Sequence, residues 1–184
     1  MRIEIMDTTL RDGEQTQGVS YSPVEKLHIA RLLLKELKVD RIEVASARVS
    51  KGEFEALKKI TGWAIENDFH NKVEVLGFID GDISLNWIRD AGGKVINLLC
   101  KGSLRHLEKQ LRKDPETHAR DIKEIINKAG DSGMDVNIYL EDWSNGMIHS
   151  EDYVFFMIDS FKDEPVKRIM LPDTLGILNP EQTF

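Results

Sequence analysis

Hydrophobic and polar positions along the chain follow two periods, one typical of strands and one typical of helices. The segment Arg2–Met6 alternates and predicts a strand. Ser22 and Pro23 predict the start of a helix whose apolar positions recur at helical spacing as far as Leu37. The same succession continues, with strands expected at 41–45, 72–78, 94–99, 136–140 and 166–171, helices at 51–66, 83–91, 115–129 and 152–161, a helical turn within 104–111 and a helix start at 179–182.

Six strands that alternate with five helices predict stacked βα units and a mainly parallel sheet. Two architectures fit this order: an open doubly wound sheet, and a (β/α)₈ TIM barrel truncated to about six strands and five helices. An open sheet that binds a dinucleotide needs a G-x-G-x-x-G turn after its first strand, but the segment 7–16 holds a single glycine, Gly13. The barrel is therefore favoured. Linkers are short, so we expect residues 1–184 to form one unit, the N-terminal portion of a barrel that needs about 250 residues when complete.

Composition narrows the function classes. Hydrophobic residues make up 41% of the 184 residues, which is enough to bury a core. The balance of 25 basic and 32 acidic residues, with no basic run, argues against a nucleic-acid partner. The single cysteine, Cys100, allows neither an internal disulfide nor a cysteine cluster for zinc. No apolar run approaches the roughly 18 residues of a membrane span, and the start of the chain lacks a signal-peptide pattern. We therefore expect a cytoplasmic protein with no membrane partner.

Polar side chains stand where the predicted strands end. Ligands bind at the carboxyl ends of the strands in both candidate architectures, and in a barrel these residues would converge on one mouth. Asp12 is a suitable hard ligand for a divalent ion, and Arg11 can hold an anionic oxygen. This set suits carbonyl chemistry, in which negative charge develops on oxygen. The residues at the six strand ends are Arg11, Asp12, Glu43, Leu76, Leu99, Tyr139, Glu141, Asp173 and Thr174.

Each of these residues also has a purely structural interpretation. Asp12 and Asp173 could belong to turns, and Glu43 could pair with a nearby arginine. Tyr139, Leu76 and Leu99 could be ordinary core residues. The five histidines lack paired metal-ligand spacing and are expected at the surface or at helix caps, whereas Cys100 is expected to pack in the core. The segment Trp143–Gly146 is expected to be a loop over the mouth or a plain turn.

The segment Asp7–Gln15, with the sequence DTTLRDGEQ, resembles the opening signature of the isopropylmalate, citramalate and homocitrate synthases. These enzymes share a metal-dependent barrel superfamily with 3-hydroxy-3-methylglutaryl-CoA lyase. The segments Ile42–Ala45 and Leu171–Gly176 support the resemblance, and the stretches 43–52 and 139–146 are most similar to bacterial citramalate synthases. The resemblance spans the whole chain but only the first part of the catalytic barrel.

The resemblance implies an acyltransferase that joins acetyl-CoA to a 2-oxo acid held on a divalent metal such as Mn, Mg or Zn. By motif, Asp12 would be a metal ligand and Arg11 would steady the oxyanion or the oxo-acid oxygen. Glu43 would anchor Arg11 or the metal shell, and Thr174 would bind the oxo-acid carboxylate. Glu141 would be the base or its relay, as a carboxylate in a partly apolar mouth.

The same resemblance implies the substrate class. Leu76, Leu99 and Tyr139 resemble the small apolar pocket that receives the methyl group of pyruvate, and Gln15 would reach the substrate. A pocket discriminates one or two methylenes by only about 1–3 kcal/mol, so pyruvate is preferred over 2-oxoisovalerate without excluding it. The product would be citramalate or 2-isopropylmalate, for branched-chain amino-acid biosynthesis.

The chain departs from the family at its metal site. The family completes that site with a His-x-His pair on a later strand, and no His-x-His occurs in this sequence. We therefore expect a longer gene product, and a fragment that binds metal poorly by itself. Separately, we expect the full-length protein to be a homodimer. Two other functions remain open: a metal-dependent lyase or aldolase of the same superfamily, and an inactive barrel fragment.

Overall fold

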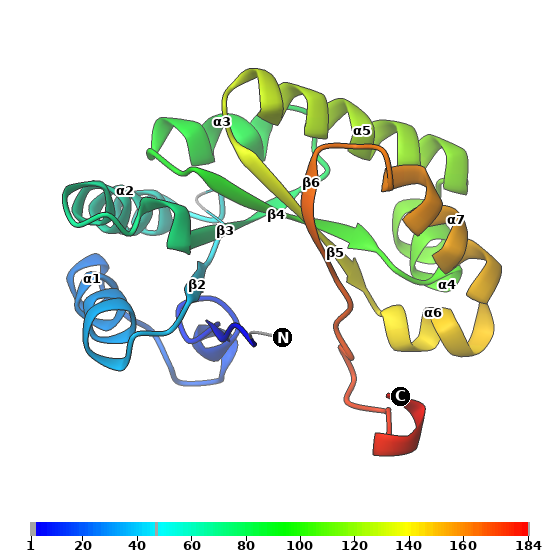
Figure 1. Ribbon diagram of the computed structural model, residues 1–184, viewed down its shortest axis with the longest axis horizontal. Helices are drawn as coiled ribbons and strands as arrows, with labels where there is room; N and C mark the ends of the chain where they lie inside the picture. Colours follow the sequence, from blue (N-terminus) through cyan, green and yellow to red (C-terminus); the bar gives the residue numbers. More distant parts are fainter. Residues whose placement is uncertain (1–2, 47, 184) are drawn as a thin grey trace. The chain divides into compact units, whose positions relative to one another are not determined.

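A computed structural model shows parallel strands in sequential order, joined by helices (Figure 1). The structure describes residues 3–46 and 48–183. Sequential parallel strands, each followed by a helix, are the topology of the first six βα units of a (β/α)₈ barrel, so the predicted fold class is confirmed. The strands, in their order along the sheet, are β1 (Met6–Asp7), β2 (Arg41–Val44), β3 (Val73–Phe78), β4 (Val95–Lys101), β5 (Asp135–Glu141) and β6 (Val166–Met170).

The helices fall close to the predicted ranges. Helical turns without a regular α pattern extend or link several of them. They are η1 (Gly13–Gln15), α1 (Pro23–Arg31), η2 (Leu32–Leu37), α2 (Lys51–Glu66), η3 (His70–Lys72), α3 (Ile83–Asp90), α4 (Leu104–His106), η4 (Leu107–Leu111), α5 (Pro115–Asp131), α6 (Trp143–His149), α7 (Glu151–Phe161) and η5 (Pro180–Gln182). Within the part of the chain that the structure describes, none of these helices is long and apolar enough to cross a membrane.

The chain folds as two compact units. The even composition along the chain gave no sign of this division. Unit 1 comprises residues 1–97 and 132–134, and unit 2 comprises residues 98–131 and 135–184. The division passes through β4. Each unit has its own apolar core, so each is described separately below.

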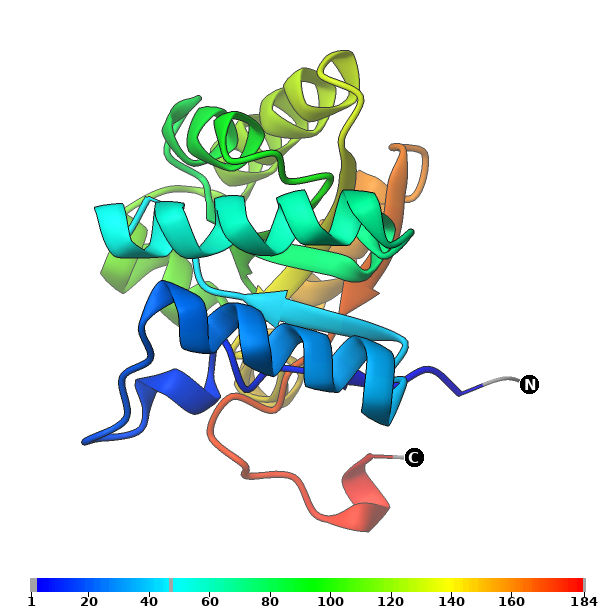
Figure 2. The ribbon, with the colours of Figure 1, turned by 90° about the vertical axis from the view of Figure 1, so that its left-hand side faces the viewer.

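Unit 1 is built on β1, β2 and β3, whose neighbours pair in parallel. Helix α1 begins at a capping box in which the Ser22 hydroxyl accepts from the Glu25 amide and the Glu25 carboxylate accepts from the Ser22 amide. Helices α1 and α2 lie side by side (Figure 2). Their apolar faces, the strands and one side of α3 form the core of unit 1. This core includes Ala30, Leu34, Ile42, Val44, Leu57, Ile60, Val73, Val75 and Ile88.

Unit 2 is built on β5 and β6, which pair in parallel with a register shift after Val136. Helix α5 packs on α7, and its buried positions recur at helical spacing. The core of unit 2 includes Leu98, Leu107, Ile122, Ile126, Ile138, Leu140, Val154, Met157 and Phe161.

The first strand is shorter than its sequence pattern predicts. We expected a strand over residues 2–6, of which Arg2 lies outside the described residues, and the structure has β1 at Met6–Asp7. The preceding segment is held by the loop before β2, because the Ile5 amide donates to the Asp40 carboxylate and the Ile5 carbonyl accepts from the Asp40 amide. The Ile5 carbonyl also accepts from the Arg41 amide at 3.2 Å, but Ile3 and Ile5 remain exposed, so the alternating pattern does not bury an apolar face there.

A helix replaces the loop that we expected at Trp143–Gly146. The structure forms α6 there, beginning after Asp142, whose φ of 65° places it in the left-handed region. Gly146 lies inside this helix, where an ideal Cβ would stand 2.0 Å from the Gly102 carbonyl oxygen. The missing side chain therefore lets α6 approach the end of β4.

Two helix glycines of unit 2 make this contact testable. Gly146→Ala should lower the free energy of unfolding by about 2–3 kcal/mol, because the new methyl group overlaps the Gly102 backbone. Gly130→Ala in α5 should raise it by about 0.5–1 kcal/mol, because a Cβ there meets nothing within 4 Å. Urea denaturation measures both values. Equal effects for the two variants would contradict the contact.

Candidate functional site

The loop after β1 is tightly folded and carries three of the predicted site residues. The amides of Arg11, Asp12 and Gly13 all donate to the carbonyl of Thr8, at 3.0, 2.8 and 3.1 Å. Leu10 is buried and fixes the start of the loop in the core of unit 1. The Arg11 side chain therefore leaves the backbone from a constrained position.

Arg11 contacts the buried carboxylate of Glu43. The guanidinium Nε lies 3.3 Å from Glu43 Oε2, and Asn97 Nδ2 donates to Glu43 Oε1 at 2.8 Å. Glu43 has no exposed surface, so its charge requires these partners. The predicted pairing of Glu43 with Arg11 is present, and Asn97 is a partner that the sequence did not single out.

Asp12 stands at the surface beside Arg11. Its Oδ1 lies 2.6 Å from Arg11 Nη1, and its side chain is 63% exposed. Among the described residues, no group of three or more His, Cys, Asp or Glu side chains could hold a metal ion. Asp12 thus offers one carboxylate, and the described residues do not complete a metal centre.

The other two predicted residues of unit 1 differ in exposure. Gln15 is exposed at the end of η1, where its amide donates to the Asp12 carbonyl. Leu76 is buried in β3.

In unit 2, Glu141 forms an ion pair with Lys101. Lys101 ends β4 and Glu141 ends β5, and the ammonium donates to Glu141 Oε2. Both side chains are largely shielded from solvent, at 12% and 25% exposure, so salt screens this pair less than it screens a surface salt bridge. We expected Glu141 in a partly apolar mouth, and its nearest charged neighbour is this lysine, which the sequence did not single out.

The backbone of Lys101 is fixed from two sides. Its amide donates to His118 Nε2 at 3.1 Å, and its carbonyl accepts from the Tyr153 hydroxyl at 2.7 Å. Burial lowers the pKa of His118 to about 4, Lys113 and Lys101 act in the same direction, and Asp121 opposes them. The imidazole is therefore neutral at pH 7, which leaves Nε2 able to accept the amide hydrogen.

Thr174 reaches the segment that follows Glu141. Its hydroxyl accepts from the Asp142 amide at 2.9 Å, while the buried Asp142 carboxylate accepts from Ser103 and Asn145, both at 2.7 Å. Burial opposes ionisation of Asp142, but these two hydrogen bonds outweigh it and the pKa lies below its usual value. The predicted substrate-binding hydroxyl of Thr174 thus also positions the backbone next to Glu141.

The remaining candidates of unit 2 are half-buried: Leu99 and Tyr139 lie in strands, and Asp173 follows the end of β6. Leu99 lies in β4 and Tyr139 in β5, opposite Met170 of β6. Asp173, which sequence analysis placed at a strand end, accepts from the Ser144 hydroxyl and from the Leu178 and Ile177 amides, and these hydrogen bonds lower its pKa.

Two other sequence interpretations have clear outcomes. Cys100 is fully buried, and burial raises the pKa of its thiol, which fits the expected packing role. His118 is also fully buried, so the expectation that every histidine lies at the surface or at a cap is wrong. The sequence contained a signal for this burial, because His118 lies at helical spacing from Ile122 and Ile126, which form the buried stripe of α5.

A profile of the HMGL-like family matches residues 2–184. The chain belongs to the HMGL-like family. Curated relatives share about a third of its residues. A putative (R)-citramalate synthase of Methanopyrus kandleri is 32% identical over 99% of this chain and 34% of its own length, and the (R)-citramalate synthase of Methanocaldococcus jannaschii is 35% identical over 100% and 35%. A probable 2-isopropylmalate synthase of Ignicoccus hospitalis is 33% identical over 97% of this chain and 42% of its own.

The chain therefore spans between a third and half of the length of these relatives. The similarity to citramalate and 2-isopropylmalate synthases confirms the family that the sequence signature suggested. Among solved structures, the HMG-CoA lyase of Bacillus subtilis superposes with a TM-score of 0.78, covering 98% of this chain and 61% of its own. At 19% identity that likeness supports the fold alone.

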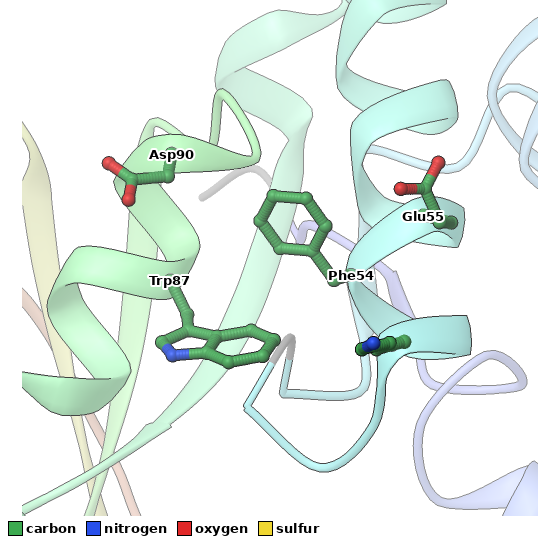
Figure 3. Close-up of a pocket in the computed structure, with 5 residues that line it drawn as sticks. Phe54, Glu55, Trp87 and Asp90 are labelled. Atoms are coloured by element: carbon green, nitrogen blue, oxygen red, sulfur yellow. The ribbon is translucent and has the colours of Figure 1, made fainter.

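A separate pocket of about 470 Å³ lies between α2 and α3 of unit 1 (Figure 3). The rings of Phe54 and Trp87 meet edge to face there, with centroids 5.5 Å apart. Lys51, Glu55 and Asp90 complete the described lining, which includes none of the predicted site residues.

The buried His118 predicts how the stability of this HMGL-like chain depends on pH. The unfolded histidine binds a proton near pH 6.5 and the folded one only near pH 4, so stability rises with pH across that window. The free energy of unfolding should fall by roughly 1.5 kcal/mol between pH 6.5 and pH 5.0. His118→Gln should remove most of this fall, and urea titrations at the two pH values measure it.

The exposed His28 provides the control. His28→Gln should keep the fall of the wild-type protein. Asp114, Asp142 and Asp173 have pKa values below the usual 3.8, so their contributions are lost only at lower pH. A His118→Gln protein with the wild-type pH dependence would show that the imidazole is not the responsible group.

Proposed function

We propose that the protein containing this chain condenses acetyl-CoA with a small 2-oxo acid. Pyruvate, giving citramalate, is our first choice of substrate, and 2-oxoisovalerate, giving 2-isopropylmalate, is the second. The observation that carries the proposal is the contact of Arg11 with buried Glu43 beside exposed Asp12, on the loop that bears the synthase signature. The names of the curated relatives support the same reaction class.

Arg11 is the group proposed to bind the oxygen of the oxo acid. A guanidinium has five N–H donors in a fixed plane, so it can bind an oxo-acid oxygen in addition to Glu43 and Asp12. Glu43 and Asn97 fix the orientation of that plane before substrate arrives. An arginine oriented in advance stabilises the alkoxide that forms when the keto carbon is attacked.

Glu141 is the group proposed to accept a proton from the acetyl methyl group. The electron pair of the broken C–H bond then forms the new C–C bond to the keto carbon, and the keto oxygen becomes an alkoxide. Water subsequently cleaves the thioester and releases CoA as its thiol. Lys101 holds Glu141 in one orientation, and Thr174 fixes the Asp142 amide immediately after it.

The metal that this family uses requires more ligands than the described residues supply. Asp12 is the one predicted ligand, and a divalent cation bound by oxygen takes about six. We therefore propose Asp12 as one contributor to a site for Mn, Mg or Zn, which would polarise the oxo acid when bound. We also propose a homodimer that acts in the cytoplasm, with acetyl-CoA and the 2-oxo acid as its small-molecule partners.

An assay of thiol release tests the reaction class. The protein containing this chain is mixed with Mn²⁺, acetyl-CoA and either pyruvate or 2-oxoisovalerate. Release of CoA that depends on the oxo acid supports the proposal. Formation of an oxo acid or ketone from a hydroxyacyl substrate, with no condensation, would instead indicate a lyase of the same superfamily, and silence in both directions together with no metal uptake would indicate an inactive fragment.

Asp12→Ala should lower the rate of oxo-acid-dependent thiol release by roughly 100-fold or more, because it removes the one proposed metal ligand among the described residues. The fold should survive, since Asp12 is exposed. Steady-state kinetics and far-UV circular dichroism measure both outcomes. Asp90→Ala serves as control, because Asp90 is 60% exposed and also pairs with the arginine that precedes it. Near-normal turnover of Asp12→Ala would disprove the ligand assignment.

Leu99→Ala should enlarge the pocket for the oxo-acid side chain. The ratio of kcat/KM for 2-oxoisovalerate to that for pyruvate should rise by about 10-fold, within the range expected for one or two methylenes. The control is Leu98→Ala, because neighbouring strand residues point to opposite faces and Leu98 is fully buried in the core of unit 2. A ratio that changes equally in both variants would argue against the pocket.

A further inference from the structure

Unit 1 contains a buried lysine between two carboxylates. Lys26 of α1 is only 3% exposed, and its Nζ lies 2.5 Å from Glu14 Oε2 and 2.5 Å from Glu53 Oε1. Burying an ammonium is costly unless partners replace its hydration. Here two charged acceptors from different elements supply that replacement, so the three side chains form one polar cluster, which we call the Lys26 cluster.

The Lys26 cluster joins three segments that are distant in sequence. Glu14 lies in η1, Lys26 in α1, and Glu53 in the first turn of α2, where its amide donates to the Ser50 hydroxyl. The loop that follows β1 and helices α1 and α2 all appear in Figure 2. Glu14 also accepts the Tyr21 amide at 3.0 Å through its other oxygen. The cluster thereby ties both ends of the segment 14–21 to the helices.

The loop after β1 has few other restraints at this end. Leu10 and Arg11 anchor its beginning, through the core and through Glu43. Turn η1 has no buried residue. Among the described residues, the side-chain contacts that attach η1 to the rest of unit 1 are those of Glu14 with Lys26 and with the Tyr21 amide.

We propose that Lys26 is a positioning residue for the candidate site. By holding Glu14, it fixes the end of the loop and so keeps Arg11 aligned with Glu43 and Asp12 turned outward. Lys26 itself is buried and is not proposed to touch substrate. The consequence for catalysis depends on the proposed function, whereas the alignment of Arg11 does not.

The alternative is a cluster that only stabilises unit 1. Loss of the Lys26 charge would then lower stability without a particular effect on Arg11. The two possibilities differ in one observable, the protection of the Arg11 Nε–H, whose nitrogen is shielded from solvent and lies 3.3 Å from Glu43 Oε2 as an ion-pair contact. Exchange of this hydrogen with solvent, followed by nitrogen-15 NMR, reports the alignment without any need for activity.

The experiment compares Lys26→Met with Thr61→Val. Thr61 is a buried residue of α2 whose hydroxyl donates to the Ala91 carbonyl at 2.6 Å, so its loss destabilises unit 1 away from the loop. The Arg11 signal is assigned by its disappearance in Arg11→Lys. The Nε–H of Arg41, whose guanidinium is placed by Glu4 and Glu74, is an internal reference.

Exchange of the Arg11 Nε–H should quicken by about 10-fold or more in Lys26→Met, while the Arg41 signal keeps its rate. Thr61→Val should change the two signals equally or not at all. Lys26→Arg, which retains the charge, should restore at least part of the protection. Unchanged Arg11 exchange in a folded Lys26→Met protein, or equal changes at both arginines, would overturn the proposal.

Glu14→Gln keeps the proposal falsifiable if Lys26→Met does not fold. That substitution preserves the volume and the acceptor for Tyr21, and Glu53 still neutralises Lys26. It should quicken Arg11 exchange, and an unchanged rate would refute the positioning role.

Kinetics then separate this inference from the proposed function. In a protein active with acetyl-CoA and a 2-oxo acid, Lys26→Met should lower kcat more than it raises KM, and Lys26→Arg should recover part of kcat. Quickened exchange in a protein without that activity would leave the positioning role intact and refute the function. Normal Arg11 exchange in a Lys26→Met variant of an active protein would refute the positioning role and leave the proposed function intact.

Discussion

Glu43 brings a carboxylate into the interior of β2, and this charge has to be compensated before the strand can be buried. An uncompensated charge at such a position costs several kcal/mol, and breaking a buried ion pair typically costs about 3–5 kcal/mol. Arg11 and Asn97 supply the compensation from the loop after β1 and from β4. The orientation of the guanidinium and the course of the first part of the loop follow from this requirement, whereas the end of the loop is held through Glu14. Glu74 of β3, which is equally buried, is paired with Arg41.

The order of strands and helices was predictable because it depends on periodicity, which a single sequence contains. Buried positions on α5 and β5 recur as their patterns require. The failures occurred where a tertiary contact decided the local structure. Residues 3–5 alternate like a strand, but Asp40 holds this segment. The segment of α6 contains a glycine, which in the sequence suggested a turn, and the helix begins after Asp142, whose backbone is left-handed.

The candidate site was only partly predictable. The signature on the loop identified Arg11 and Asp12, the motif Ile42–Ala45 added Glu43, and the structure places Arg11 in contact with both carboxylates. Asn97 and Lys101 were missed, although they share the face of β4 that carries Leu99. Their charged partners come from other strands, and no spacing within one sequence shows which strand will lie beside β4. The burial of His118 was visible in the stripe on α5, but a titratable side chain in such a stripe is easily assigned to the surface.

Gly102 and Gly146 meet where β4 ends and α6 passes, with no room for a side chain between them. Both are needed, because an ideal Cβ on Gly102 would stand 2.5 Å from the Leu140 carbonyl oxygen. Anyone exchanging segments between this chain and the longer synthases should treat these two positions as one joint. A side chain introduced at either position during such an exchange would displace the backbone around Gly102, whose amide donates to the Glu141 carbonyl at 2.6 Å.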